Sequence, residues 1–422
     1  AEQGDGVILL SPGVYRVRET LSFRADGCEL LGVGHPTILA GDLLPRILDS
    51  DGRSRLRIAG VRVQGVGVQH VGGRGAIHLD EGSTDCTVEN TEVRDAPGTG
   101  IVDDGDGNVV RGNLVERTGE HGIYVSGCRG GACTGNRIAG AGDVPDATLL
   151  AHGISVAGAS NYTVRDNLVA GGGGLGVVLR DGAHDNALTG NVLRATGDRL
   201  LLVGSGSRNL IAGNTLLDAP PGRDAVQITG GGGNRIEENF IHVTSGGGAA
   251  IRWVGQDVAG GDLVRGNVIL LDGPAVDYHV LELDGARAEP ARIAGNVMQA
   301  IRGAAPASSL HRSSGPPPET SDNLLVRESD ARTIAAGSHR AARTDLALRC
   351  DAARGAVFVT LPPAGPSRWR VLVIERRGAA GHPVIVRAAG EDRIGGARTL
   401  GVPPGRDKVY LQSTGAGWQP IA

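Results

Sequence analysis

The sequence predicts an all-β fold in which short strands stack as coils, a right-handed single-stranded parallel β-helix of about ten coils. A small C-terminal β-module of sandwich or barrel type is expected to follow it. Three observations carry this prediction: the composition and two internal repeats. The 422 residues include 70 Gly and only 3% aromatics, which suits a fold that turns every few residues and stacks small aliphatic side chains.

The first repeat is built around asparagine. An apolar residue lies three positions before and two positions after each repeated Asn, and Gly directly precedes six of the eight. A Gly-Asn corner supplies the backbone conformations of a tight bend. One coil cannot bury its apolar face alone, so neighbouring coils must stack and let the asparagines bond to one another. The repeated residues are Asn113, Asn136, Asn167, Asn191, Asn214, Asn239, Asn267 and Asn296.

The second repeat is an apolar triplet that occurs once per coil. By the two-residue period of a strand, its outer members face inward and its middle member faces outward. Asp103 is the one polar residue among eighteen inward positions. The repeat weakens before residue 75, and Asn90 is expected to begin the ladder with a one-residue offset. The triplets begin at Ile77, Ile101, Ile123, Ile154, Val177, Leu201, Val226, Ile251 and Leu281.

The predicted domain boundaries follow from where the repeats stop. Residues 1–300 are assigned to the β-helix. Residues 301–339, rich in Ala, Pro and Ser, are assigned to a linker with a last irregular coil. Residues 340–422 carry short β-patterns without the Asn repeat and are assigned to the separate C-terminal module.

Charge and hydropathy exclude some partners. The net charge of −4 does not favour nucleic acid, which attracts basic surfaces. We expect no membrane insertion, because no apolar run of about 18–20 residues is present. The five cysteines lack zinc-ligand spacing, and Cys133 in an inward position is expected to be a buried thiol.

Two stretches resemble known families. Gly6-Val-Ile-Leu-Leu-Ser-Pro-Gly-Val-Tyr15 with Leu30-Leu-Gly-Val-Gly34 resembles the opening of pectate-lyase-like β-helix proteins, a family that includes lyases, hydrolases, epimerases and phage tailspikes. The series Val359-Thr-Leu-Pro-Pro363, Gly381-His-Pro-Val-Ile-Val386 and Asp392-Arg-Ile-Gly-Gly396 resembles the small C-terminal β-module of phage tail fibres and spikes.

Together these resemblances imply a receptor-binding spike of a phage or of a phage-derived particle such as a gene-transfer agent. Such a spike is expected to be a homotrimer, extracellular or on the particle surface, that binds and in some cases cleaves a surface polysaccharide. A secreted polysaccharide lyase, hydrolase or epimerase, acting on bacterial, plant or algal polymers, is the alternative. A non-catalytic structural stalk is a third hypothesis.

Two aspartates are candidates for acid and base catalysis. Asp80 and Asp104 occupy the same position on consecutive coils, which lie about 4.8 Å apart. Their carboxyl groups are therefore expected to approach the separation of about 5–5.5 Å found in retaining glycosidases. The alternative is ordinary turn chemistry, in which Asp is common.

A second set of candidates combines two histidines, a phenol and a cation. His121 and His152 begin parallel segments on neighbouring coils, and Tyr124 and Arg180 follow on the same face. A uronate lyase or epimerase needs a base for the C5 proton, an acid, and a cation for the developing charge. The alternative is that the histidines simply stack at coil corners.

Further residues are expected to contact substrate. They are His78, Asp103, Ser155, Gln227, Arg252 and Glu282. The insertion at 140–150 is a candidate wall for a groove, although such loops also occur without function. No metal ligand set and no cofactor are expected, with Ca²⁺ considered only for the lyase alternative.

Overall fold

The computed structural model describes most of the chain. The described residues are 6–67, 75–142, 151–194, 196–243, 248–255, 260–272, 281–284, 291–302, 311–313, 319–326, 332–342, 345, 347–367, 370–377, 382–403 and 408–420. They divide into two compact units. Within these residues no helix has the length and hydrophobicity needed to cross a membrane.

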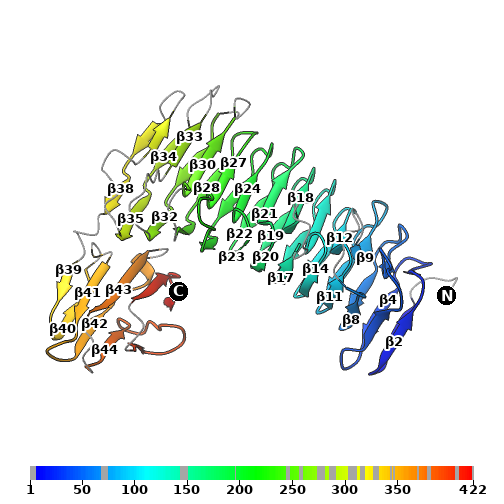
Figure 1. Cartoon of the computed structure of the whole chain (residues 1–422), viewed down its shortest axis with the longest axis horizontal. Coiled ribbons are helices and arrows are strands. Elements are labelled where there is room, and N and C mark those ends of the chain that lie inside the picture. Colours follow the sequence, from blue (N-terminus) through cyan, green and yellow to red (C-terminus); the bar gives the residue numbers. More distant parts are fainter. Residues whose placement is uncertain are drawn as a thin grey trace. The chain divides into compact units, whose positions relative to one another are not determined.

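Three parallel sheets form a β-helix (Figure 1). Each full coil contributes one strand to each sheet, so every strand pairs with the strand three positions away in the chain order. The prediction of stacked coils is confirmed, because successive strands pair in parallel register from the first coil onward.

The strands of the three sheets are short. Sheet A consists of β1 (Val7–Leu10), β4 (Glu29–Gly32), β7 (Arg57–Ala59), β10 (Thr87–Glu89), β13 (Val109–Arg111), β16 (Ala132–Thr134), β19 (Thr163–Arg165), β22 (Ala187–Thr189), β25 (Leu210–Ala212), β28 (Arg235–Glu237), β31 (Leu263–Arg265), β34 (Arg292–Ala294) and β37 (Glu319–Ser321). Sheet B consists of β2 (Val14–Val17), β5 (Thr37–Ala40), β8 (Arg62–Gln64), β11 (Glu92–Ala96), β14 (Leu114–Thr118), β17 (Arg137–Ala141), β20 (Leu168–Gly172), β23 (Val192–Arg194), β26 (Thr215–Leu217), β29 (Phe240–Val243), β32 (Val268–Asp272), β35 (Val297–Arg302) and β38 (Leu324–Val326). Sheet C consists of β3 (Leu21–Ser22), β6 (Leu48–Asp49), β9 (Gly75–Leu79), β12 (Thr99–Asp103), β15 (Ile123–Ser126), β18 (His152–Ala157), β21 (Leu175–Arg180), β24 (Leu201–Val203), β27 (Val226–Ile228), β30 (Ile251–Val254), β33 (Leu281–Asp284) and β36 (His311–Ser313).

The predicted asparagine ladder is present at the corner between sheets A and B. From Asn113 to Asn296, each side-chain Nδ2 donates to the Oδ1 of the next Asn, and each backbone N–H donates to the same oxygen, at 2.9–3.0 Å. The ladder extends one coil further than predicted, to Asn323. Because all the repeated asparagines are buried, each unmade bond would cost free energy.

Asn90 does not belong to this ladder, so that prediction was wrong. Thr91 occupies the ladder position, and its backbone N–H donates to Oδ1 of Asn113. Asn90 is exposed and has a φ of 49°, in the left-handed region that short polar side chains tolerate. It therefore makes the turn that Gly112 makes on the next coil.

A second ladder, which was not predicted, lies at the corner between sheets C and A. Asn186, Asn209 and Asn234 each donate from Nδ2 to the side-chain oxygen of the following member, ending at Asp262. The other carboxylate oxygen of Asp262 accepts a 2.8 Å hydrogen bond from Nε1 of Trp253. Both corners of sheet A are thus held by polar side chains buried inside the coil.

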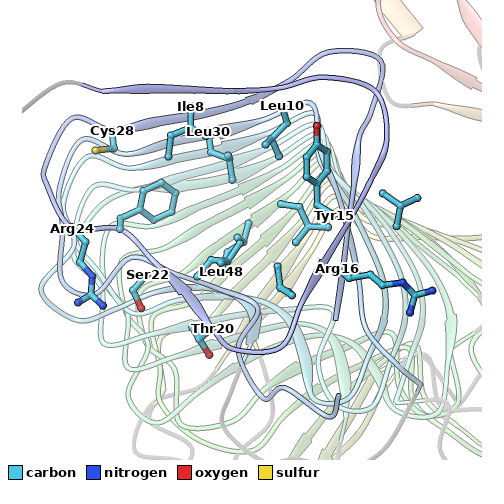
Figure 2. Close-up of a pocket in the computed structure, with 15 residues that line it drawn as sticks. Ile8, Leu10, Tyr15, Arg16, Thr20, Ser22, Arg24, Cys28, Leu30 and Leu48 are labelled. Atoms are coloured by element: carbon cyan, nitrogen blue, oxygen red, sulfur yellow. The ribbon is translucent and has the colours of Figure 1, made fainter. Parts of the chain in front are cut away.

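The first coil encloses an apolar hollow of about 770 Å³ (Figure 2). Ile8 and Leu10 point into it from β1, and Leu30 and Leu48 line it from the next coil. Ile8 and Leu30 belong to the inward column that continues as the fully buried Ile58 and Val88. Ile8 retains 49% exposure, so among the described residues the core of the first coil is not closed.

The chain between 301 and 339 contains more strand than predicted. Strands β36, β37 and β38 continue the three sheets to Val326, and the C-terminal module begins at Arg332 rather than near 340.

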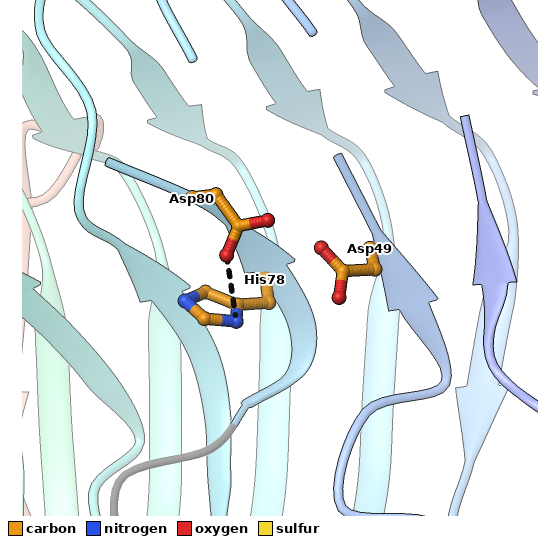
Figure 3. A group of neighbouring side chains, drawn as sticks. All are labelled: Asp49, His78 and Asp80. Carbon is orange, nitrogen blue, oxygen red and sulfur yellow. Dashed lines mark ion pairs between the residues drawn. The ribbon is translucent and has the colours of Figure 1, made fainter. Parts of the chain in front are cut away.

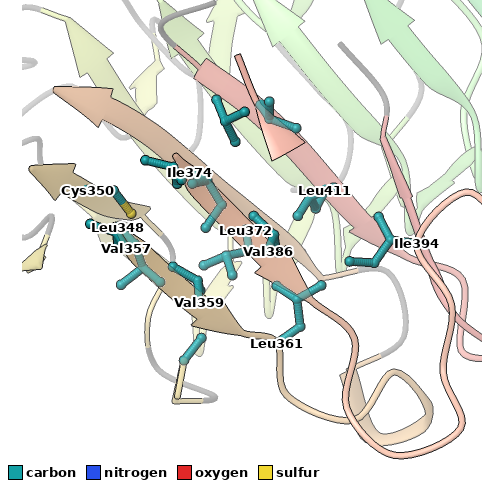
Figure 4. Packing of buried hydrophobic residues seen from close by; sticks show 14 of the residues in the cluster. Leu348, Cys350, Val357, Val359, Leu361, Leu372, Ile374, Val386, Ile394 and Leu411 are labelled. Atoms are coloured by element: carbon teal, nitrogen blue, oxygen red, sulfur yellow. The ribbon is translucent and has the colours of Figure 1, made fainter. Parts of the chain in front are cut away.

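The C-terminal module has two mixed sheets. One consists of β39 (Arg332–Ile334), β41 (Ala347–Asp351), β43 (Val371–Arg377), β46 (Lys408–Ser413) and β47 (Trp418–Pro420). The other consists of β40 (Gly337–Arg340), β42 (Val357–Thr360), β44 (Val384–Arg387) and β45 (Thr399–Val402). A 3₁₀ turn spans Gly365–Ser367. Leu348, Val359, Leu372 and Val386 meet in the core between the sheets (Figure 4).

Candidate functional site

The outward face of sheet C carries a continuous column of side chains. The strand register aligns Asp49, His78, Val102, Tyr124, Ser155, Val178, Leu202, Gln227, Arg252 and Glu282. Their inward neighbours form the core, so this column is on the outer side of the sheet. Six of its described members are nevertheless buried: Asp49, His78, Val102, Ser155, Val178 and Gln227. Two groups of ionisable side chains lie along it and are named here the acid cluster and the ring cluster.

The acid cluster consists of Arg46, Asp49, His78, Asp80 and Asp104. One guanidinium nitrogen of Arg46 lies 2.7 Å from Asp49 Oδ2 and 3.2 Å from Asp80 Oδ1. The imidazole of His78 lies beside both carboxylates, with Nδ1 3.4 Å from Asp80 Oδ1 (Figure 3). Its other nitrogen, Nε2, lies 2.9 Å from Asp104 Oδ2.

The pKa values of Asp49 and Asp80 move in opposite directions. Burial opposes ionisation of Asp49, but hydrogen bonds from Arg46, Asp80 and the N–H of Asp51 outweigh it and hold its pKa below the ordinary value. Burial and the hydrogen bond with Asp49 raise the pKa of Asp80. The two carboxyl groups are therefore not equivalent, and Asp49 ionises more readily than Asp80.

Asp80 and Asp104 occupy the same position on consecutive coils, as predicted, but they do not form a facing carboxyl pair. The strand pairing places Asp104 next to Asp80 because Asp103 aligns with Leu79. The imidazole of His78 lies between the two carboxylates and contacts both. His78 therefore links the two carboxylates that were predicted as an acid and base pair.

The ring cluster consists of His121, Tyr124, His152 and Arg180 on three consecutive coils. The ring of His121 stacks on Tyr124 at 5.2 Å and on His152 at 5.0 Å between centroids. The guanidinium of Arg180 lies over the Tyr124 ring, 5.6 Å from its centroid, within the range of a cation–π contact. The stacking of the coils brings these four residues together, as their positions in the repeat predicted.

Exposure divides the ring cluster into two layers. Tyr124 and Arg180 are partly exposed, whereas His121 and His152 are 4% and 3% exposed. Burial and the positive charge of Arg180 lower the pKa of His152 to about 4, so this imidazole is neutral near pH 7. The phenol and the guanidinium are consequently the groups that a bound polymer can reach.

Comparisons with known proteins agree with the geometry. Residues 50–216 match the family model described as the right handed beta helix region. The chain is a right-handed parallel β-helix protein. A search of curated proteins gave no significant sequence match to this β-helix protein.

Solved structures share the fold at low sequence identity. The A-module of the Azotobacter vinelandii mannuronan C-5 epimerase AlgE6 matches with a TM-score of 0.55 and 19% identity, over 76% of this chain and 91% of that one. The catalytic unit of an α-1,3-glucanase from Streptomyces thermodiastaticus matches with a TM-score of 0.51 and 15% identity, over 76% and 63%. The Dettilon tailspike protein matches with a TM-score of 0.49 and 14% identity, over 96% and 69%. At these identities the likeness concerns the β-helix fold.

Four predicted substrate contacts are buried: His78 and Gln227 are 3% and 8% exposed, and Asp103 and Ser155 have no exposed surface. The carboxylate of Asp103 accepts hydrogen bonds from Asn108 Nδ2 at 2.8 Å and from the Tyr162 hydroxyl at 2.9 Å. Burial raises the pKa of Asp103 to about 6. The hydroxyl of Ser155 accepts a 3.3 Å hydrogen bond from Nε of Arg180. Asp103 and Ser155 are placed to position other groups.

The later coils of the β-helix continue the polar column. Gln227 is mostly buried and donates to Asp224 Oδ2 at 3.2 Å, and Arg252 is partly exposed. Glu282 follows in register with Arg252, but its side chain lies outside the described residues. The insertion at 140–150 is described only as far as Gly142, so its role as a wall lies outside them as well.

Sequence reasoning missed Arg46 and Asp49, which complete the acid cluster. Both precede residue 75, where the repeat is too irregular to assign a register from the sequence. The signal that could have found Asp49 is its place after Leu48, because the pair aligns with Ile77 and His78. All five cysteines are free and buried, which confirms the prediction for Cys133.

Proposed function

We propose that this β-helix acts on an acidic polysaccharide at the ring cluster, by moving the C5 proton of a uronate unit. The carrying observation is the arrangement of Arg180 over Tyr124, both partly exposed, above two buried imidazoles. A fixed cation beside a phenol is suited to a substrate that brings its own carboxylate next to the proton to be moved.

The chemistry follows from the positions of these groups. Arg180 pairs with the uronate carboxylate, and its charge stabilises the electron pair that flows into that carboxylate when the C5 proton leaves. Tyr124 offers the proton-transfer atom at the surface. After its own proton has passed to solvent, Tyr124 takes the C5 proton. A solvent proton returned to the opposite face of C5 inverts the sugar. Transfer of the proton from Tyr124 to the C4 oxygen instead breaks the C4–O bond, forms a C4=C5 double bond and cleaves the chain by elimination.

The buried histidines position the phenol. His121 packs against the Tyr124 ring, and His152 packs under His121. Because His152 stays neutral near pH 7, no second positive charge competes with Arg180 for the substrate carboxylate. The shared fold with a protein named as a mannuronan C-5 epimerase supports this choice of substrate class.

The decisive experiment offers the chain three kinds of polymer: mannuronate-rich, galacturonate-rich and neutral glucan. Ultraviolet absorbance reports unsaturated ends from elimination, proton NMR reports inverted units, and a reducing-end assay reports hydrolysis. We expect elimination or inversion on a uronate polymer and no action on the neutral glucan. Hydrolysis of the neutral glucan, or no reaction with any polymer, would contradict the proposal.

A non-catalytic receptor-binding spike is the second candidate. It is favoured by the C-terminal segments that resemble tail-fibre modules, including Val359–Pro363 and Gly381–Val386. Under this alternative the chain forms a homotrimer on a particle or outside the cell, and the ring cluster binds polymer without changing it. Sedimentation at micromolar concentration tests the trimer, and retention of unaltered polymer on the immobilised chain identifies the spike.

A further inference from the structure

The side chain of His78 has an unusual environment for a buried imidazole. It is 3% exposed, and Nε2 lies 2.9 Å from Asp104 Oδ2. Its Nδ1 makes no hydrogen bond, and Asp80 Oδ1 lies 3.4 Å from it in an ion-pair contact. This nitrogen faces Asp49 and Asp80, and ligand atoms of the three residues all lie within 4.8 Å of one another (Figure 3).

This orientation leaves an electron pair pointed at two carboxylates. Nε2 of His78 lies at hydrogen-bond distance from an Asp104 oxygen, so when the imidazole carries one proton, that proton lies on Nε2 and Nδ1 keeps its lone pair. The Nδ1 lone pair is then directed towards Asp49 and Asp80, whose oxygens are also acceptors. Such an arrangement is favourable when a cation lies among the three groups.

We propose that Asp49, His78 and Asp80 bind a divalent transition metal ion of the zinc or manganese class. Two carboxylates and one imidazole form a mixed oxygen and nitrogen ligand set, which suits these ions, whereas Ca²⁺ prefers oxygen ligands alone. Asp104 orients the imidazole from behind, as carboxylates commonly do for metal-binding histidines.

The ion would connect neighbouring coils. Asp49 ends β6, whereas His78 lies in β9 and Asp80 follows that strand on the next coil. The site lies close to the first coil, whose apolar core is open among the described residues. A bound ion would therefore join two neighbouring coils of the β-helix through their side chains.

Arg46 competes for the same carboxylates. Its guanidinium contacts Asp49 and Asp80 through one nitrogen, and its side chain is 32% exposed. A metal ion must draw at least one carboxylate oxygen from this pair, so Arg46 lowers the affinity without blocking the site. Arg46→Met keeps the aliphatic stem and removes the competing charge, and it should bind the metal more tightly.

The test equilibrates the full chain with Zn²⁺, Mn²⁺ or Ca²⁺, removes free ions by dialysis and measures metal per chain. Close to one Zn²⁺ or Mn²⁺ is expected, with a higher melting temperature for the loaded chain. His78→Ala should lose the ion, and Asp104→Asn should weaken binding about 10–100-fold. His184→Ala is the matched control, because His184 forms an exposed pair with Asp185 at 2.9 Å.

Circular dichroism of each variant separates lost binding from lost folding. Retention of the ion by folded His78→Ala, or preference for Ca²⁺, overturns the proposal. Absence of binding in both the natural chain and Arg46→Met overturns it as well. If Arg46→Met alone binds the ion, Arg46 is the site's own cation and the proposal fails for the natural chain.

Discussion

The backbone N–H of His152 donates a 3.0 Å hydrogen bond to Nδ1 of His121. This bond requires Nδ1 to be an acceptor, so the proton of a neutral His121 lies on Nε2. The same two residues stack ring on ring. The strand register of sheet C therefore fixes both the orientation and the tautomer of the imidazole that supports Tyr124.

The pH dependence of the free energy of unfolding should show the titration of His152. Its pKa falls from 6.5 in the unfolded chain to about 4 in the folded one, so the unfolded state binds more protons between these values. The contribution of neutral His152 to the free energy of unfolding is fully present above pH 6.5. It is lost as the pH falls towards 4, which lowers the free energy of unfolding by up to about 3 kcal/mol. His152→Phe should flatten this part of a urea-unfolding profile, whereas His184→Phe should not. An unchanged profile for His152→Phe would contradict this account.

Replacement of Tyr124 should separate chemistry from binding. Tyr124→Phe removes the proton-transfer oxygen and keeps the ring that stacks on His121 and faces Arg180. We expect the rate on a uronate polymer to fall about 10²–10⁴-fold with little change in polymer retention. Arg180→Gln should lower both the rate and the retention of polymer. Arg208→Gln is the control and should change neither quantity, because Arg208 is exposed and pairs with Asp185. Full activity of Tyr124→Phe would remove the phenol from the mechanism.

The buried carboxylate of Asp103 predicts a second pH effect with the opposite sign. Burial raises its pKa from 3.8 to about 6, so this group favours folding most below 3.8 and loses that contribution as the pH rises through 6. Tyr162→Phe removes a 2.9 Å donor to the charged form. The variant should lose about 1.5–3 kcal/mol above pH 6 and less near pH 4. Tyr15→Phe, whose hydroxyl is exposed, is the control, and an equal loss at both pH values would refute the charge argument.

The asparagine ladder should be most sensitive at its centre. Asn191 donates to Val164 O and Asn214 Oδ1, and it accepts two bonds from Asn167. Asn191→Ala leaves these buried partners unpaired and should cost about 3 kcal/mol or more. Asn90→Gly should be close to neutral because the exposed turn has a positive φ. Chemical unfolding measures both, and equal effects would show that the ladder contributes little.

The fold was predictable because its repeat is strict from Asn113 onward. Each repeated Asn lies at the corner between sheets A and B, so the same pattern of apolar residues before and after the Asn recurs on every coil. The second ladder escaped prediction because its column begins with mixed residue types: Cys86, Asn108, Gly131 and Tyr162 precede its three consecutive asparagines. A column that changes chemistry along its length gives no periodic signal.

The site was only partly predictable from the sequence. Coil register brought His121, Tyr124, His152 and Arg180 together correctly, because they lie within the regular repeat. The sequence could not show that His78 would separate Asp80 from Asp104, since this depends on the side-chain rotamer rather than on register. It also could not show burial, as Ser155 faces outward and still has no exposed surface.

The asparagine ladder gives the β-helix a direction. Every rung from Asn113 to Asn296 donates to the asparagine of the next coil, and its Nδ2 also donates to a backbone carbonyl of the preceding coil rather than to an asparagine there. The amide dipoles therefore align and polarise one another, which strengthens bonds in series. Loss of one rung weakens its neighbours on both sides, so unfolding that begins at either end of the β-helix should advance coil by coil, with the rungs nearest the opening lost first.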